Sequence, residues 1–125
     1  MDINYTDMLS RKLDNFIEKH YENNKSALLL KGARQVGKTS AIRKYARKEK
    51  MNLIEINFYE DDSACGIFKG SQNAKDVLLR ISAHTKKKTS LPNTMIFFDE
   101  VQKCPEVITW IKFLVDEGSC KYAIS

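Results

Sequence analysis

One eight-residue stretch limits the possible folds of this chain more than any other part of the sequence. Residues 32–39 are Gly-Ala-Arg-Gln-Val-Gly-Lys-Thr, which fits the pattern G-x-x-x-x-G-K-[ST] at every defined position. The glycines allow a tight loop whose backbone N–H groups converge, and such a loop can surround a ligand with several negative charges. The pattern therefore predicts a phosphate-binding loop that follows a strand and precedes a helix.

The residues on either side of the loop agree with this prediction. Ahead of it, the apolar run 27–30 is expected to form a strand that is buried on both faces. Behind it, apolar residues recur at helical spacing within 39–50; they are Ala41, Ile42, Tyr45 and Ala46. The N-terminal end of that helix would add to the attraction for phosphate.

The residues of the loop have expected roles in binding. Lys38 would reach the β- and γ-phosphates of a nucleotide and contribute to catalysis, and Thr39 would hold Mg²⁺. The residues expected to contact the nucleotide are Gly32, Ala33, Arg34, Gln35, Val36, Gly37, Lys38, Thr39 and Ser40.

A second apolar run, later in the chain, ends in two carboxylates. Residues 95–100 are Met-Ile-Phe-Phe-Asp-Glu, which has the form of a Walker B segment. By itself this run indicates only a strand followed by a turn, but together with a phosphate loop it indicates a site. Asp99 is expected to hold Mg²⁺, which prefers oxygen ligands. Glu100 is expected to orient or deprotonate the water that attacks the γ-phosphate.

Alternating helices and strands predict an α/β fold. Helices are expected over about 6–22 with Thr6 as N-cap, over 39–50, from Ser71 or Asn73 onward, and from Pro105 to Gly118. Strands are expected at 27–30, 53–58, 95–99 and 121–125, the second of them at a sheet edge. Strands joined by helices imply a parallel sheet with helices on both faces and the nucleotide at the carboxyl ends of the strands. The prediction is one three-layer P-loop domain whose nucleotide-binding core spans about 25–125.

Three of these helices carry apolar stripes that are expected to be buried. The stripe of the first helix contains Leu9, Leu13, Phe16, Ile17 and His20. The stripe of the helix after Asn73 contains Ala74, Val77, Leu78 and Ile81. The stripe of the last helix contains Val107, Ile108, Ile111, Leu114 and Val115.

Composition excludes several classes of protein. The 125 residues are 42% hydrophobic and 30% charged, which is typical of one globular domain. No apolar run has membrane-spanning length and the N-terminus lacks a signal-peptide pattern, so we expect a cytoplasmic protein without a membrane partner. Three cysteines, Cys65, Cys104 and Cys120, lack metal-ligand spacing and are expected to be free thiols. His20 and His84 are expected to have no special role.

The charge distribution leaves two alternatives open. The net charge is +5, and basic residues gather at 31–50 and at 86–88. This field could attract nucleotide, nucleic acid or an acidic partner. The basic residues after the loop fall opposite an apolar helix face and lack interleaved aromatics, which favours a solvated surface and gives nucleic-acid binding only weak support. The acidic patch 60–62 is either a second metal site or a solvated loop, and the loop is favoured.

Four segments together resemble a known family. The loop at 32–39, Phe-Phe-Asp-Glu-Val-Gln at 97–102, Pro105, and Ile-Lys-Phe-Leu-Val-Asp at 111–116 are similar to segments of uncharacterised prokaryotic AAA-type ATPases. The resemblance covers about residues 9–125. It implies the additional-strand class of P-loop fold, with strand 121–125 inserted between the phosphate-loop strand and the Walker B strand. It also implies that 1–125 is the N-terminal portion of an ATPase domain, truncated after the fourth strand and followed by a separate C-terminal domain.

The resemblance implies further site residues. The inserted strand would end in a polar sensor that contacts the γ-phosphate or the attacking water, so Ser125, or a residue beyond it, is a candidate. Gln102 is a second candidate for contact with the γ-phosphate; the alternative is a loop glutamine that bonds to backbone. A C-terminal domain or partner protein would respond to the hydrolysis of ATP.

Three functions remain open on this basis. Glu100 beside Asp99 favours an Mg²⁺-dependent ATPase, because a water-activating carboxylate works against transfer to another acceptor. A small-molecule kinase would need an acceptor-binding cluster, and the sequence shows none. The third function is an ATP-binding module without turnover. GTP is disfavoured, because Asp99 is not followed by x-x-Gly and the motif Asn-Lys-x-Asp does not occur.

Overall fold

A computed structural model describes the backbone of residues 5–31 and 37–125, with side chains described from Leu9 onward within those ranges. The helices are α1 (Tyr5–Asn23), α2 (Lys38–Lys48), α3 (Ala74–Thr85) and α4 (Glu106–Glu117). The strands are β1 (Leu28–Leu29), β2 (Asn52–Asn57), β3 (Thr94–Asp99) and β4 (Cys120–Ile124). Two 3₁₀ segments, η2 (Asp62–Phe68) and η3 (Val101–Lys103), follow β2 and β3.

The strands form one parallel sheet in the order β1-β4-β3-β2. This order confirms the α/β fold with a parallel sheet, and it confirms that β4 lies between β1, which precedes the predicted phosphate loop, and β3, the predicted Walker B strand. It also places β2 at an edge of the described sheet, as its alternating pattern predicts. All four carboxyl ends consequently lie at the same end of the sheet, where a ligand can contact several strands at once.

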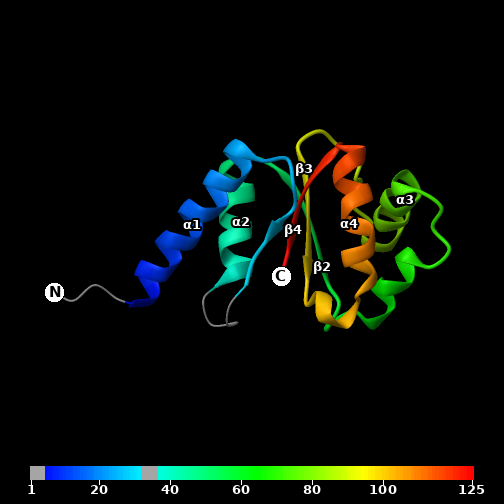
Figure 1. Cartoon of the computed structure of the whole chain (residues 1–125), viewed down its shortest axis with the longest axis horizontal. Helices are drawn as coiled ribbons and strands as arrows, with labels where there is room; N and C mark the ends of the chain where they lie inside the picture. The colour runs from blue at the N-terminus through cyan, green and yellow to red at the C-terminus, as the bar shows by residue number, and fades with distance from the viewer. Residues whose placement is uncertain (1–4, 32–36) are drawn as a thin grey trace.

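Helices cover both faces of the sheet, with α1 and α2 on one side and α3 and α4 on the other (Figure 1). Alternate residues of β3 explain why its whole run is apolar. Met95 and Phe97 lie in the core under α1 and α2, whereas Ile96 and Phe98 lie in the core under α3 and α4. A central strand between two helical layers is buried on both faces, as the sequence of β3 predicts.

Local capping explains where the later helices begin and end. Asn73 is the N-cap of α3, and its side chain accepts a hydrogen bond from the Asp76 backbone N–H at 2.8 Å. Gly118 ends α4 in the left-handed conformation, with φ 84°. The first helix differs from the prediction, because α1 begins at Tyr5 and Thr6 therefore lies inside it.

Three apolar residues are more exposed than the sequence predicts. Leu29 is 48% exposed, so β1 is buried on one face only; it is an edge strand that α3 and α4 do not cover. Phe16 in α1 is 53% exposed and Ile108 in α4 is 58% exposed. Only one face of each helix packs against its neighbours. The apolar stripes predicted for α1 and α4 are broader than this packed face, so residues at their margins stay exposed.

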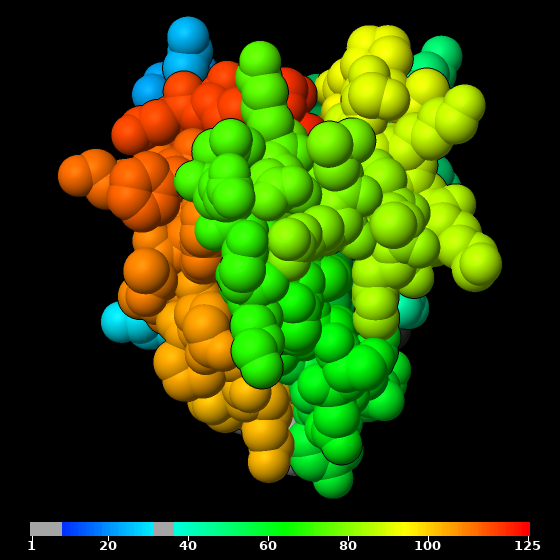
Figure 2. Space-filling model, turned by 90° about the vertical axis from the view of Figure 1, so that its right-hand side faces the viewer, coloured from blue at the N-terminus to red at the C-terminus, as the bar shows by residue number. Residues whose placement is uncertain are grey.

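The expectation of three free thiols is wrong for one pair. Cys65 and Cys104 form a disulfide, with their Cα atoms 5.7 Å apart, and only Cys120 is a free cysteine. The pair is separated by 39 residues, so no short spacing indicates it. The two cysteines meet because η2 and the start of α4 follow the carboxyl ends of the neighbouring strands β2 and β3. Figure 2 shows the face of the molecule that η2, α3 and α4 form.

Within the described ranges, none of the helices is both long enough and apolar enough to cross a membrane.

Candidate functional site

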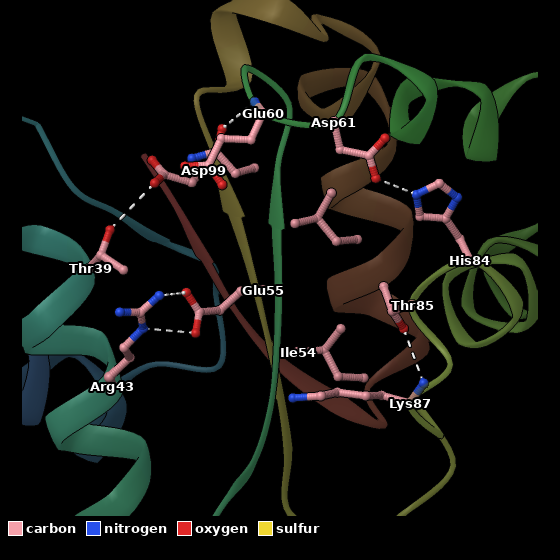
Figure 3. A pocket seen from close by; sticks show the side chains of 12 residues that line it. Thr39, Arg43, Ile54, Glu55, Glu60, Asp61, His84, Thr85, Lys87 and Asp99 are labelled. Carbon is pink, nitrogen blue, oxygen red and sulfur yellow. Dashed lines mark hydrogen bonds and ion pairs between the residues drawn. The ribbon is translucent and has the colours of Figure 1, made fainter.

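Thr39 and Asp99 meet at the carboxyl end of the sheet. Thr39 lies in the first turn of α2 and Asp99 is the last residue of β3. The Thr39 hydroxyl donates a hydrogen bond to Asp99 Oδ2 at 3.4 Å (Figure 3). One hydroxyl oxygen and one carboxylate oxygen at this separation are the type of ligands that Mg²⁺ takes, so the residues present fit that ion.

A cavity of about 300 Å³ surrounds this contact. The residues that line it are Gly37, Lys38, Thr39, Ser40, Asn57, Asp99 and Glu100. The fold therefore brings the described end of the predicted phosphate loop together with Asp99 and Glu100, the two carboxylates of the predicted Walker B segment. The loop residues Gly32, Ala33, Arg34, Gln35 and Val36 lie outside the described residues.

Gly37 connects the loop to the helix with an unusual backbone conformation. Its φ is 73°, in the left-handed region, and its carbonyl accepts a hydrogen bond from the Ala41 N–H at 2.9 Å. Glycine adopts this conformation without the steric cost that a side chain would add. The first turn of α2 contains no acidic residue, so its N-terminal end carries no side-chain charge that would repel a phosphate.

Glu100 also has a left-handed backbone, with φ 58° and ψ 46°, although it is not a glycine. Its N–H donates to Asp99 Oδ1 at 2.9 Å, and its carbonyl accepts from the Lys103 N–H at 3.0 Å. Gln102 donates a side-chain hydrogen bond to Glu100 Oε2. The turn after β3 therefore fixes Glu100 through backbone and side-chain contacts, and Gln102 contacts this carboxylate directly.

Ser125 is half-buried at the end of β4, beside the same turn. Its N–H donates to the Phe98 carbonyl at 2.9 Å, and its own carbonyl accepts from the Val101 N–H at 3.1 Å. These bonds tie the end of the inserted strand to the turn that carries Glu100. The lining of the 300 Å³ cavity does not include Ser125 among its described residues.

A larger cavity, of about 500 Å³, adjoins the first along the outer side of β2 (Figure 3). The two cavities share Thr39, Asn57 and Asp99. Asn57 was not predicted as a site residue, yet it lies in register with Asp99 on the neighbouring strand. Its signal in the sequence is that it is a polar residue at the carboxyl end of a predicted strand.

The far wall of the larger cavity contains a pair of ionisable side chains. His84 Nε2 lies 2.5 Å from Asp61 Oδ2, and this hydrogen bond, with a second from Ser63, holds the pKa of Asp61 below its usual range. His84 thus has a specific partner that the sequence did not suggest. Among the described residues, no group of potential metal-ligating side chains includes 60–62.

The basic face of α2 is largely neutralised by acids. Arg43 makes two hydrogen bonds of 2.9 Å to Glu55, and these raise the pKa of Arg43. Lys44 pairs with Asp14 at 2.6 Å, and Lys48 pairs with Glu18. These pairs give α2 contacts with α1 and β2, and they reduce the positive surface that nucleic acid would require.

The comparison with protein families decides the classification of this fold. A family model described as an AAA domain matches residues 24–125. The chain belongs to the AAA domain family. The matched part of this AAA domain contains the whole sheet and begins after α1. Membership supports the P-loop fold and an ATP-binding, ATPase-type function. No curated protein and no solved structure matches this chain.

Proposed function

We propose that this AAA domain hydrolyses ATP in a Mg²⁺-dependent reaction and that hydrolysis switches or drives an attached domain or partner protein. The observation that carries the proposal is the contact between Thr39 and Asp99, with Glu100 on the same cavity. It joins a metal-binding pair to a carboxylate that can activate water. Phosphoryl transfer to water depends mainly on such positioning and charge stabilisation.

The residues would divide the work of hydrolysis. Thr39 and Asp99 would hold Mg²⁺, which when bound would neutralise charge on the β- and γ-phosphate oxygens. Lys38, which lines the cavity, would stabilise the charge that develops on the same phosphates. The backbone N–H groups at the start of α2 would add further stabilisation.

Glu100 would be the general base. Its left-handed backbone is unfavourable for a residue with a side chain, by about 1–3 kcal/mol, and such strain persists where the surroundings impose it. Here the left-handed conformation turns the chain sharply after β3, and both Asp99 and Glu100 line the cavity. A carboxylate beside the phosphates could take a proton from the attacking water.

The second candidate function is a small-molecule kinase. The observation that keeps it open is the 500 Å³ cavity, which shares Thr39 and Asp99 with the proposed phosphate site. An acceptor hydroxyl bound there would be close to a γ-phosphate. Glu100 favours water as the acceptor, so hydrolysis remains the primary proposal.

Replacement of Glu100 by glutamine tests the proposal. We expect Glu100→Gln to retain ATP binding and to lose phosphate release by a factor on the order of 10² or more, as for the loss of a positioned base. Phosphate release is measured at saturating ATP, with and without DNA, and binding is measured by titration calorimetry.

A charge-matched control accompanies this variant. Glu22→Gln removes an equal charge from an exposed position on α1 and should leave turnover unchanged. Unchanged turnover in Glu100→Gln would contradict the role of Glu100. Phosphorylation of an added small molecule in place of phosphate release would favour the kinase.

A further inference from the structure

The disulfide between Cys65 and Cys104 lies beside the turn that carries Glu100. Cys104 is the C-cap of η3, and its N–H donates to the Val101 carbonyl at 2.9 Å. Cys65 belongs to η2, the segment that follows β2. The bond therefore ties the turn after β3 to the segment after β2, and the two segments adjoin at the base of Figure 2, in orange and green.

The two sulfurs differ in access. Cys104 is fully buried in the core under α3 and α4, whereas Cys65 is partly exposed. An attacking thiolate must reach a disulfide sulfur from solvent, so exchange would begin at Cys65. Cys104 would then be the leaving thiol, and once protonated it would behave as a small apolar side chain in the core.

The surroundings also suit the reduced state. Glu106 Oε2 lies 3.2 Å from Cys65 Sγ, where it can accept a hydrogen bond from a Cys65 thiol. Once the disulfide is reduced, this hydrogen bond would give the Cys65 thiol a polar partner at its partly exposed position.

We propose that Cys65 and Cys104 form a reversible thiol–disulfide site that couples the redox state of small thiols to nucleotide turnover by this domain. The reactants are a low-molecular-weight dithiol for reduction and a low-molecular-weight disulfide for oxidation. The part concerning turnover rests on the proposed ATPase function. The part concerning thiol exchange does not.

The exchange balances as a two-electron reaction. One thiolate of the dithiol bonds to Cys65 Sγ, the bond between the two protein sulfurs breaks, and Cys104 leaves with the electron pair and takes a proton. The second thiolate of the reagent then displaces Cys65, which also takes a proton. The products are two protein thiols and the oxidised reagent; a small disulfide such as glutathione disulfide reverses both steps.

Reduction changes what holds the Glu100 turn. Without the bond to η2, the turn keeps its internal hydrogen bonds and the bond from the Val101 N–H to Ser125. A base that is less firmly positioned slows the chemical step more than it weakens binding, and small displacements can have large effects on rate. We expect reduction to lower the turnover number by about threefold or more and to change KM by less than about twofold.

The test combines thiol mapping with turnover in buffers that contain graded ratios of reduced to oxidised dithiothreitol, a small dithiol and its disulfide. The full chain is equilibrated, quenched in acid and alkylated, and the modified cysteines are identified by peptide mass. We expect Cys65 and Cys104 to become alkylated together as the buffer becomes reducing. Turnover should fall over the same range.

Two variants act as controls. Cys65→Ser keeps a hydroxyl donor near Glu106 but cannot form the bond, so its turnover should match that of the reduced protein in every buffer. Cys120→Ser changes a half-buried cysteine at the opposite end of the sheet and should respond like the unchanged protein.

Several outcomes would overturn the inference. Alkylation of Cys65 and Cys104 in the most oxidising buffer would show that the pair does not form the bond. Equal turnover in both states, or a redox response that persists in Cys65→Ser, would refute the coupling. Absence of hydrolysis in every buffer would refute the proposed function together with the coupling, while the alkylation pattern would still decide whether the pair exchanges.

Discussion

Thr39 and Asp99 are 60 positions apart in the chain, yet a hydrogen bond of 3.4 Å joins their side chains. Each was predicted from its own motif, because residue type and spacing match those of a phosphate loop and of a strand end that would hold Mg²⁺. Their contact depends on how strands are ordered in the sheet. At the residue scale, the motifs identify the candidate site residues, and the fold determines whether those residues are in contact.

The conformation of Gly37 leads to a prediction about stability. In Gly37→Ala the added Cβ would have no heavy atom of the described residues within 4 Å, so the expected cost comes from the left-handed backbone at φ 73°. We expect a loss of about 1–2 kcal/mol in the free energy of unfolding, measured by urea denaturation. Gly66→Ala is the matched control, because its Cβ would also be unobstructed and its φ is not positive. Equal stability of the two variants would contradict this explanation.

The start of α3 and the end of α4 are the features of the elements that follow most directly from the sequence. Asn73 and Gly118 mark the ends of α3 and α4 because each satisfies backbone groups that a helix end leaves unpaired. The packed faces were harder to predict. Ile108 matches the helical spacing of its neighbours but is 58% exposed, because the face of α4 that packs into the core contains Val107, Ile111 and Leu114 and Ile108 lies beside it.

Removal of the α3 cap tests the assignment of that boundary. Asn73→Ala deletes the acceptor of the Asp76 N–H and should lower the free energy of unfolding by about 1 kcal/mol. Asn73→Gly should cost only a few tenths of a kcal/mol, because water can then reach the unpaired N–H groups. Urea denaturation of both variants measures the difference. A cost in Ala no greater than that in Gly would show that the cap contributes little.

At the scale of the whole molecule, α1 lies outside the matched AAA domain but is joined to it through several contacts. Besides the ion pairs with α2, Tyr21 stacks on Tyr45 with ring centroids 5.3 Å apart. The Tyr21 hydroxyl donates to the backbone carbonyl of Tyr122 in β4 at 2.5 Å. Burial, with a smaller effect of Tyr45, raises the pKa of Tyr21, so this phenol keeps the proton that it donates.

The hydrogen bond between Tyr21 of α1 and Tyr122 of β4 can be tested by removal of the Tyr21 hydroxyl group. Tyr21→Phe keeps the stacked ring and removes the hydroxyl, so we expect a loss of about 1 kcal/mol in the free energy of unfolding. Denaturant titration measures the change. Unaltered stability would mean that water replaces the Tyr21 hydroxyl without cost and that α1 is held by its other contacts.

The sequence by itself determined the class of fold, and it indicated the chemistry that we propose. The features that allowed this are local: the loop at 32–39, the two carboxylates after an apolar strand, and the alternation of helices with strands. Each depends on residues that are close together in the sequence, so it can be identified without the tertiary structure. The inserted position of β4 came from family resemblance, and the strand order confirms it.

Only the tertiary structure decided which distant residues touch. It joined Cys65 to Cys104, His84 to Asp61 and Arg43 to Glu55, and it exposed Leu29 at the edge of the sheet. None of these pairs has a spacing that a helix or a turn would produce. The physical reason is that long-range contacts follow from the order of strands and from the layers that cover them, and a parallel sheet brings together chain segments that the sequence keeps far apart.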